Sequence, residues 1–208
     1  MGDARELEGR CGVCPGETDR ETPEVLAAIR RGDADALDAL ARRHAPGLFR
    51  VALRLTGRRE DAEDLVQETL VRALPKLAAF EGRASVATYL FRVLANLWKN
   101  RLRSRKRSRI VEWLRSREQR DEHAPPEVDP ADPRPLALEQ LEREERAARV
   151  RDALAAIEPA RRLTLLLREV QELPYEQIAE ITAVPVGTVR SRLARAREDL
   201  RLLLRSRS

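Results

Sequence analysis

Residues 173–197, LPYEQIAEITAVPVGTVRSRLARAR, have the pattern of two short helices joined by a tight turn. Ala179 is a small residue at a place where two crossing helices can approach closely. Val189 and Leu193 are spaced to lie on one buried side of the second helix. The rest of that helix is rich in arginine, and a basic second helix is typical of a helix-turn-helix that enters the major groove of DNA. The stretch therefore predicts a nucleic-acid-binding protein.

The turn between these two helices contains one residue that fits poorly. The backbone of such a turn tends to be left-handed and usually holds glycine, whereas this sequence has Ala183. A left-handed conformation costs a residue with a side chain roughly 1 kcal/mol or more. We expect either a strained turn or a different turn geometry. An ordinary antiparallel helix pair with a solvated basic face is the alternative interpretation.

The composition favours an all-α fold. The chain has 208 residues, of which 36% are charged and 3% aromatic, and alanine, leucine, arginine and glutamate dominate. The formal net charge of +5 is unevenly distributed. Residues 92–111 contain eight basic residues and no acid, whereas residues 117–146 contain ten acids and five bases. This segregation predicts a surface that binds polyanions and a separate acidic spacer.

The apolar spacing predicts two small helical domains joined by a flexible, acidic, proline-rich linker. Five of the twelve prolines lie between His123 and Pro135, where they prevent a continuous helix. We expect a disordered N-terminal tail over residues 1–22, a first domain over 23–110, a linker over 111–140 and a second domain over 141–208. No apolar run approaches the length of a membrane span, and no signal peptide is evident, so we expect a cytoplasmic protein without membrane contact.

Cys11 and Cys14 form a CxxC pair near the N-terminus. A zinc site needs four ligands, but the chain has only these two cysteines, and its two histidines, His44 and His123, lie at unrelated positions. We therefore expect no metal and no cofactor. A regulatory thiol switch and an incidental pair in a mobile tail are the alternatives for this motif. A cysteine-based redox enzyme would need a strand-to-helix context that the segment does not offer.

Two separate parts of the chain resemble one family. Residues 175–181 and 185–197 resemble region 4 of the extracytoplasmic-function (ECF) sigma factors, the small members of the sigma-70 family. Residues 61–74, DAEDLVQETLVRAL, resemble the region 2 helix that docks on RNA polymerase in that family. Residues 80–83, FEGR, and 88–100, TYLFRVLANLWKN, are similar to its promoter-melting segment. The resemblance implies a sigma factor without enzymatic activity.

The resemblance implies three sets of contact residues. The β′ clamp helices of core RNA polymerase would contact Asp64, Gln67 and Glu68. The −10 element of promoter DNA would contact Phe80, Arg83, Thr88, Tyr89, Arg92, Asn96, Lys99, Asn100 and Arg103. The −35 element would contact Thr188, Arg190, Ser191, Arg192 and Arg195. Most relatives have tryptophan where this chain has Tyr89, and tyrosine stacks less extensively.

The resemblance also implies protein partners. These are core RNA polymerase, through its β′ clamp helices and its β flap, and an anti-sigma factor that masks the polymerase-binding surfaces. The alternative to a sigma factor is a stand-alone, dimeric helix-turn-helix transcriptional regulator. That class of protein would need a dimer interface and a palindromic DNA site.

Overall fold

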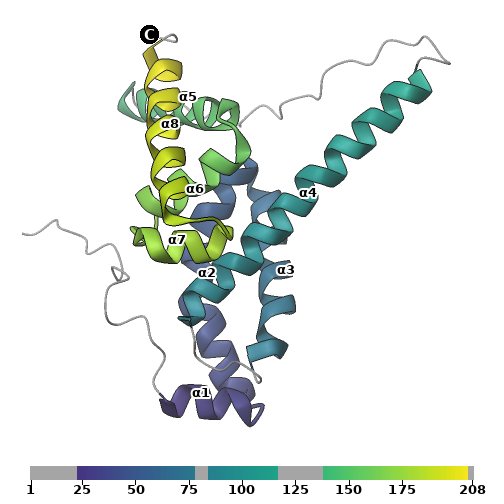
Figure 1. Ribbon diagram of the computed structural model, residues 1–208, viewed down its shortest axis with the longest axis vertical. Coiled ribbons are helices and arrows are strands. Elements are labelled where there is room, and N and C mark those ends of the chain that lie inside the picture. Colours follow the sequence, from purple (N-terminus) through teal and green to yellow (C-terminus); the bar gives the residue numbers. More distant parts are fainter. Residues whose placement is uncertain (1–22, 78–83, 117–137, 206–208) are drawn as a thin grey trace, which may run out of the picture.

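The computed structural model describes residues 23–77, 84–116 and 138–205, and all the regular elements in these ranges are helices (Figure 1). The first half contains α1 (Pro23–Arg30), α2 (Ala34–Thr56), α3 (Arg59–Leu77) and α4 (Val86–Ser116). The second half contains α5 (Leu138–Ala156), α6 (Pro159–Glu169), α7 (Tyr175–Thr182) and α8 (Val186–Arg205). The all-α prediction is confirmed.

Local interactions fix where several helices begin and end. The Asp33 carboxylate accepts hydrogen bonds from the backbone amides of Asp35 and Ala36, at 3.0 and 3.2 Å, and caps α2. Gly57 ends the same helix in a left-handed conformation, with φ of 77°. The Ser85 hydroxyl accepts a hydrogen bond from the Thr88 amide at 3.1 Å, so Ser85 caps the start of α4. These caps satisfy backbone groups that the helices themselves leave unpaired.

The core of the first half lies between α2, α3 and α4, where Leu48, Leu65 and Leu90 are fully buried. The core of the second half includes Leu163 and Ile178. Both belong to one continuous cluster of buried side chains that crosses from one half to the other. The two halves therefore share apolar surface and are not held together by the intervening chain alone.

Helices α4 and α5 extend into the range that the sequence predicts to be a linker. Helix α4 continues to Ser116, and α5 begins at Leu138, so both ends of the range 111–140 are helical. The proline-rich centre of this range lies outside the described residues, as do the N-terminal tail, the Cys11 and Cys14 pair, and the loop with Phe80 and Arg83.

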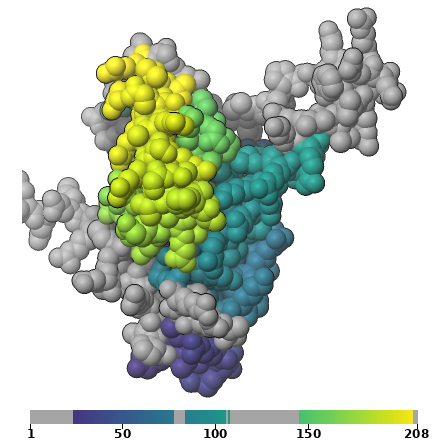
Figure 2. Space-filling model, viewed as in Figure 1, coloured from purple at the N-terminus to yellow at the C-terminus, as the bar shows by residue number. Residues whose placement is uncertain are grey.

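The second half packs directly against the first. Helix α7 lies against α4, while α5 and α6 contact α2. Figure 2 shows the green and yellow surface of the second half pressed against the teal surface of α4. Within the described ranges, none of the helices has the combination of length and apolar character needed to cross a bilayer.

Candidate nucleic-acid interface

The turn of the helix-turn-helix is left-handed at the residue that the sequence marks as unfavourable. Ala183 has φ of 56° and ψ of 49° and ends α7. The backbone amides of Ala183 and Val184 both donate to the Ala179 carbonyl, the second at 3.1 Å, and close the end of the helix. Ile178 and Val189 are fully buried beneath the turn. The strained alternative is therefore correct, and apolar burial by the flanking helices offsets its cost.

Helix α8 presents a basic surface next to this turn. Val189 and Leu193 are buried as predicted, which leaves the arginine side of the helix accessible. Among the residues predicted to contact the −35 element, Arg190, Ser191 and Arg195 are exposed, whereas Thr188 and Arg192 are half-buried. The exposed guanidinium groups have the geometry to bind phosphate or the edge of guanine.

Two contacts distinguish the arginines near α8. The Arg190 guanidinium lies 6.0 Å from the centre of the Tyr175 ring, a weak contact that leaves its donors accessible. Arg197 instead donates two hydrogen bonds to the Glu169 carboxylate, at 2.7 and 3.0 Å. These hydrogen bonds raise the pKa of Arg197. The Arg197 guanidinium is therefore engaged by Glu169, whereas the exposed Arg190 guanidinium is available to a ligand.

Helix α4 carries most of the residues predicted to contact the −10 element. Apart from the adjacent pair Lys99 and Asn100, they recur every three or four residues, so they share one side of the helix: Tyr89, Arg92, Asn96, Lys99, Asn100 and Arg103. Asn96, Asn100 and Arg103 are exposed, and the other three are half-buried. The side combines cations, amides and one aromatic ring, which suits a nucleic-acid strand.

Thr88 does not belong to this side of the helix surface. Its side chain is only 1% exposed, and its hydroxyl lies 2.9 Å from the Ser85 hydroxyl. The residue completes the cap of α4 and has no free face for DNA in this conformation. The sequence placed Thr88 correctly at the start of a helix but could not show that the helix start is buried.

Helix α3 bears the three residues predicted to contact the polymerase, and they differ in exposure and in their contacts. Asp64 and Gln67 are exposed. Glu68 is half-buried and bound by two arginines: Arg101 of α4 and Arg72 of α3 both approach its carboxylate to 2.7 Å. One predicted docking residue is therefore also part of the contact between α3 and α4.

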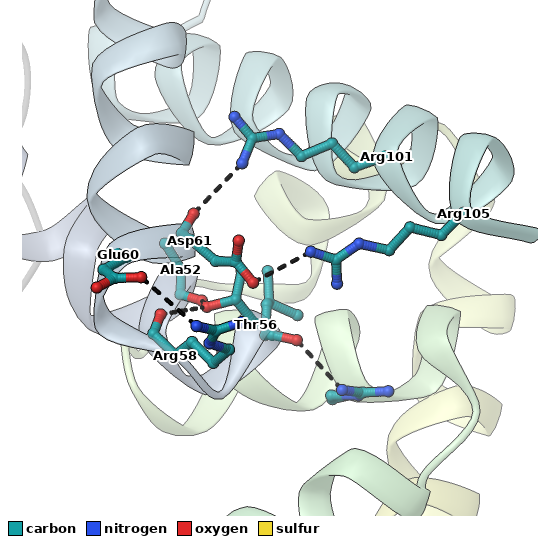
Figure 3. A network of polar contacts seen from close by, with 9 residues as sticks. Ala52, Thr56, Arg58, Glu60, Asp61, Arg101 and Arg105 are labelled. Atoms are coloured by element: carbon teal, nitrogen blue, oxygen red, sulfur yellow. Dashed lines mark hydrogen bonds and ion pairs between the residues drawn. The ribbon is translucent and has the colours of Figure 1, made fainter. Parts of the chain in front are cut away.

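Two arginines in the basic part of α4, Arg101 and Arg105, contact α3. Figure 3 shows Arg101 and Arg105 extending from α4 toward Asp61, at the start of α3. Arg105 forms an ion pair with the Asp61 carboxylate at 3.1 Å, and Arg101 donates to the Asp61 carbonyl at 3.3 Å. Because acids of α3 occupy these two arginines, the run offers less free charge to phosphate than its sequence indicates.

Three residues at the contact between the halves are not predicted from the sequence: Gly47, Arg162 and Gln171. The Arg162 guanidinium donates to the Leu55 carbonyl at 3.2 Å, and the Gln171 amide donates to the Gly47 carbonyl at 3.1 Å. A signal for Arg162 existed, because it shares a helix face with the buried Leu166. A charged residue on an apolar face indicates a buried partner.

Similarity to known proteins agrees with this arrangement. Residues 40–108 match the family Sigma-70 region 2, and residues 147–200 match Sigma-70, region 4. The ECF RNA polymerase sigma factor SigM of Mycobacterium tuberculosis is 33% identical over 199 residues, which cover 93% of this chain and 92% of that protein. SigE of Mycolicibacterium smegmatis is 35% identical over 177 residues, covering 82% of this chain and 63% of that protein.

A solved structure is similar as well. The sigma factor RpoE of Bartonella quintana, determined in complex with the anti-sigma factor NepR, matches with a TM-score of 0.59 and 28% identity. The match covers 81% of this chain and 96% of that one. Basic faces on α4 and α8, an acidic face on α3 and these similarities define a promoter-recognition subunit. The chain belongs to the sigma-70 family, in its group of ECF RNA polymerase sigma factors.

Proposed function

We propose that this chain binds core RNA polymerase through α3 and recognises two promoter elements through α4 and α8. The proposal rests on the presence of two basic helix faces, on α4 and α8, in different halves of one chain. Each half supplies one modest contact, and their covalent connection makes the second contact effectively intramolecular. A protein built this way gains most of its promoter affinity when both elements are spaced correctly on one DNA.

The proposed polymerase contact uses Asp64, Gln67 and Glu68. Exposed acids and an amide on one helix suit a basic partner helix, here the β′ clamp helices. Because Glu68 is already bound by Arg72 and Arg101, we assign the larger share of the contact to Asp64 and Gln67. The β flap is the proposed partner of the second half.

The proposed −10 contact uses the side of α4 that runs from Tyr89 to Arg103. A half-buried tyrosine next to arginine and asparagine can stack on an unpaired base and hold the adjacent phosphate. Phe80 and Arg83 belong to this proposal by resemblance alone. We assign Thr88 to capping α4, because its hydroxyl is bonded to Ser85.

The proposed −35 contact uses Arg190, Ser191, Arg192 and Arg195, with Thr188 at the start of α8. Arg190 is the strongest candidate for reading a base, since its guanidinium is exposed and lies at the turn-proximal end of the helix. Helix-turn-helix proteins place this end of the recognition helix against base edges.

The proposal extends to regulation and location. The Bartonella quintana relative was determined with an anti-sigma factor, and we propose a partner of the same class for this chain. The site of action is the cytoplasm, where core polymerase and promoter DNA are found. We propose no catalytic activity and no cofactor. The stand-alone dimeric regulator is not favoured, because both halves match sigma-factor regions.

Transcription in vitro tests the proposal. Purified core polymerase would be incubated with a library of promoter fragments, with and without the chain. We expect discrete transcripts from a subset of fragments only when the chain is present. If no start site depends on the chain, the proposed function is wrong.

A further inference from the structure

Tyr175, the first residue of α7, lies where three helices of the second half meet. Helices α6, α7 and α8 all contact one another, and α7 lies across the lower end of α8 in Figure 1. The Tyr175 ring is half-buried and packs against the apolar core, so the fold restrains its position. None of the contact sets predicted from the sequence includes Tyr175, yet the structure places it beside Arg190.

Two arginines from different helices lie over the Tyr175 ring. The Arg168 guanidinium of α6 lies 5.3 Å from the centre of the ring, and the Arg190 guanidinium of α8 lies 6.0 Å from it. The negative face of an aromatic ring attracts a cation at separations up to about 6 Å. The ring is therefore a shared contact for a half-buried arginine and an exposed one.

Arg168 is fixed by the loop that leads into α7. Its guanidinium donates to the Glu172 carbonyl at 3.3 Å and to the Leu173 carbonyl at 3.0 Å. Glu172 has a left-handed backbone, with φ of 53°, and Leu173 is buried. Arg168 therefore ties the end of α6 to a tight turn directly before Tyr175, and this link defines where the ring lies at the start of α7.

The other arginine of α8 near the ring has a stronger partner of its own. Arg197 donates two hydrogen bonds to the Glu169 carboxylate, and its pKa is raised mainly by Glu169, with a smaller contribution from Tyr175. Within the described residues, no carboxylate pairs with Arg190 and no hydrogen bond engages its guanidinium. The Tyr175 ring is the contact that restrains Arg190 in this part of the chain.

A restrained guanidinium has an advantage in reading a base. An arginine side chain samples many rotamers when it is free, and its ordering on DNA costs conformational entropy. Contact with a fixed ring reduces the number of conformations that Arg190 samples before DNA binds. The N–H donors of Arg190 remain available for the O6 and N7 atoms of guanine, because no hydrogen bond to the described residues occupies them.

We propose that Tyr175 is a positioning residue for −35 recognition, which holds the Arg190 guanidinium ready for a base edge while Arg168 holds the ring in place. The inference rests on the proposed role of Arg190 in reading a base of the −35 element. Because Tyr175 acts through Arg190, removal of the ring should lower the preference for the correct base pair about two- to fivefold, the effect of one exposed cation–π contact. The phosphate contacts of α8 should be unaffected.

A double-mutant cycle in the full chain, bound to core polymerase, tests this coupling. The preferred −35 duplex would compete with a duplex changed at the base pair for which Arg190→Ala relaxes the preference. Tyr175→Leu should lower the preference in the wild-type background and have no further effect in the Arg190→Ala background. Tyr175→Phe keeps the ring and should retain the wild-type preference.

Two further proteins control for packing. Phe49→Leu removes another aromatic ring beside an arginine, since the Arg59 guanidinium lies 5.8 Å from the centre of the Phe49 ring, but in the first half of the chain. This variant should leave the −35 preference unchanged. Ring-fluorinated phenylalanine at position 175 keeps the shape of the side chain and weakens the negative face of the ring. It should lower the preference relative to Tyr175→Phe, even if Tyr175→Leu fails to fold.

The outcomes separate this inference from the proposed function. If Tyr175→Leu weakens binding to both duplexes equally, lowers the preference as much in the Arg190→Ala background, or if fluorination changes nothing, Tyr175 has no positioning role and the inference is wrong. If Arg190→Ala relaxes no preference while specific initiation persists, Arg190 reads no base, and the inference fails although the promoter role stands. If the wild-type complex shows no preference among duplexes, the proposed −35 role and the inference both fail.

Discussion

The Arg101 guanidinium of α4 lies 2.7 Å from the Glu68 carboxylate of α3, two residues separated by 33 positions in the chain. This pair joins the basic helix to the acidic helix, and a second pair, Arg105 with Asp61, continues the contact. Glu68 consequently has a structural role in addition to its proposed role in docking. The two roles can be separated by comparison with Asp64, which is exposed on the same helix.

Neutralising these two acids should affect stability and binding differently. Glu68→Gln weakens two partly exposed ion pairs and should lower the free energy of unfolding by about 0.5–1 kcal/mol. Asp64→Asn should leave it unchanged, because no buried contact is lost. Both variants should weaken binding to core polymerase. Urea denaturation and a fluorescence binding assay measure the two effects. Unchanged polymerase affinity of Asp64→Asn would refute the docking role.

Replacing the strained residue of the turn should stabilise the second half. Ala183 has φ of 56°, a conformation that glycine adopts without steric cost. We expect Ala183→Gly to raise the free energy of unfolding by about 1 kcal/mol. The control, Ala179→Gly, places glycine inside α7 and should lower it by about 0.5–1 kcal/mol. Thermal and urea denaturation decide the point, and destabilisation by Ala183→Gly would show that the turn is not strained.

Truncation of Arg190 and of Arg197, both on α8, should affect DNA binding differently. Arg190→Ala should cost about 1–3 kcal/mol of binding at the preferred −35 sequence and relax specificity at one base pair. Arg197→Ala should change binding much less, because its guanidinium is bound to Glu169. The assay is competition between preferred and mutated −35 duplexes for the holoenzyme. Equal weakening on every duplex would make Arg190 a phosphate contact.

The lowered pKa of Lys99 predicts that the free energy of unfolding depends on pH. In the unfolded chain the group has its ordinary value, near 10.5, whereas in the folded chain the value is lower. Between the two values the unfolded chain binds more protons, so the free energy of unfolding rises with pH through this window. Below the window, the charged form of Lys99 opposes folding.

Lys99→Met, which keeps the length of the side chain, removes this titration. The variant should be more stable than the wild type at neutral pH, and the difference should shrink as pH approaches the ordinary lysine pKa. Urea denaturation of both proteins across this range measures the difference. A difference that stays constant with pH would show that Lys99 is not responsible.

The helices could be predicted because the apolar pattern that specifies each helix lies within a short stretch of sequence. Apolar residues recur with the helical period, and Val189 and Leu193 are buried as that spacing requires. The left-handed Ala183 was also foreseen as a conflict between turn geometry and residue type. These features depend on residues close together in the sequence, where spacing alone determines which side chains share a face.

The contact between the halves could not be predicted in the same way. Arg162 and Gln171 bind the backbone carbonyls of Leu55 and Gly47, and every residue offers such a carbonyl. No side-chain pattern marks one carbonyl as the partner. The burial of Thr88 was missed for a related reason, since a hydroxyl at a helix start serves equally as a cap and as a DNA contact.

Footprinting on a responsive promoter tests whether the chain directs core polymerase to the −35 and −10 elements. The chain and core polymerase would be added separately and together, with hydroxyl-radical cleavage reporting protection and permanganate reporting unpaired thymines. We predict that only the combination protects the −35 element and makes thymines of the −10 element reactive. Protection of a palindromic site by the chain alone, with no reactive thymines when polymerase is added, would contradict the claim.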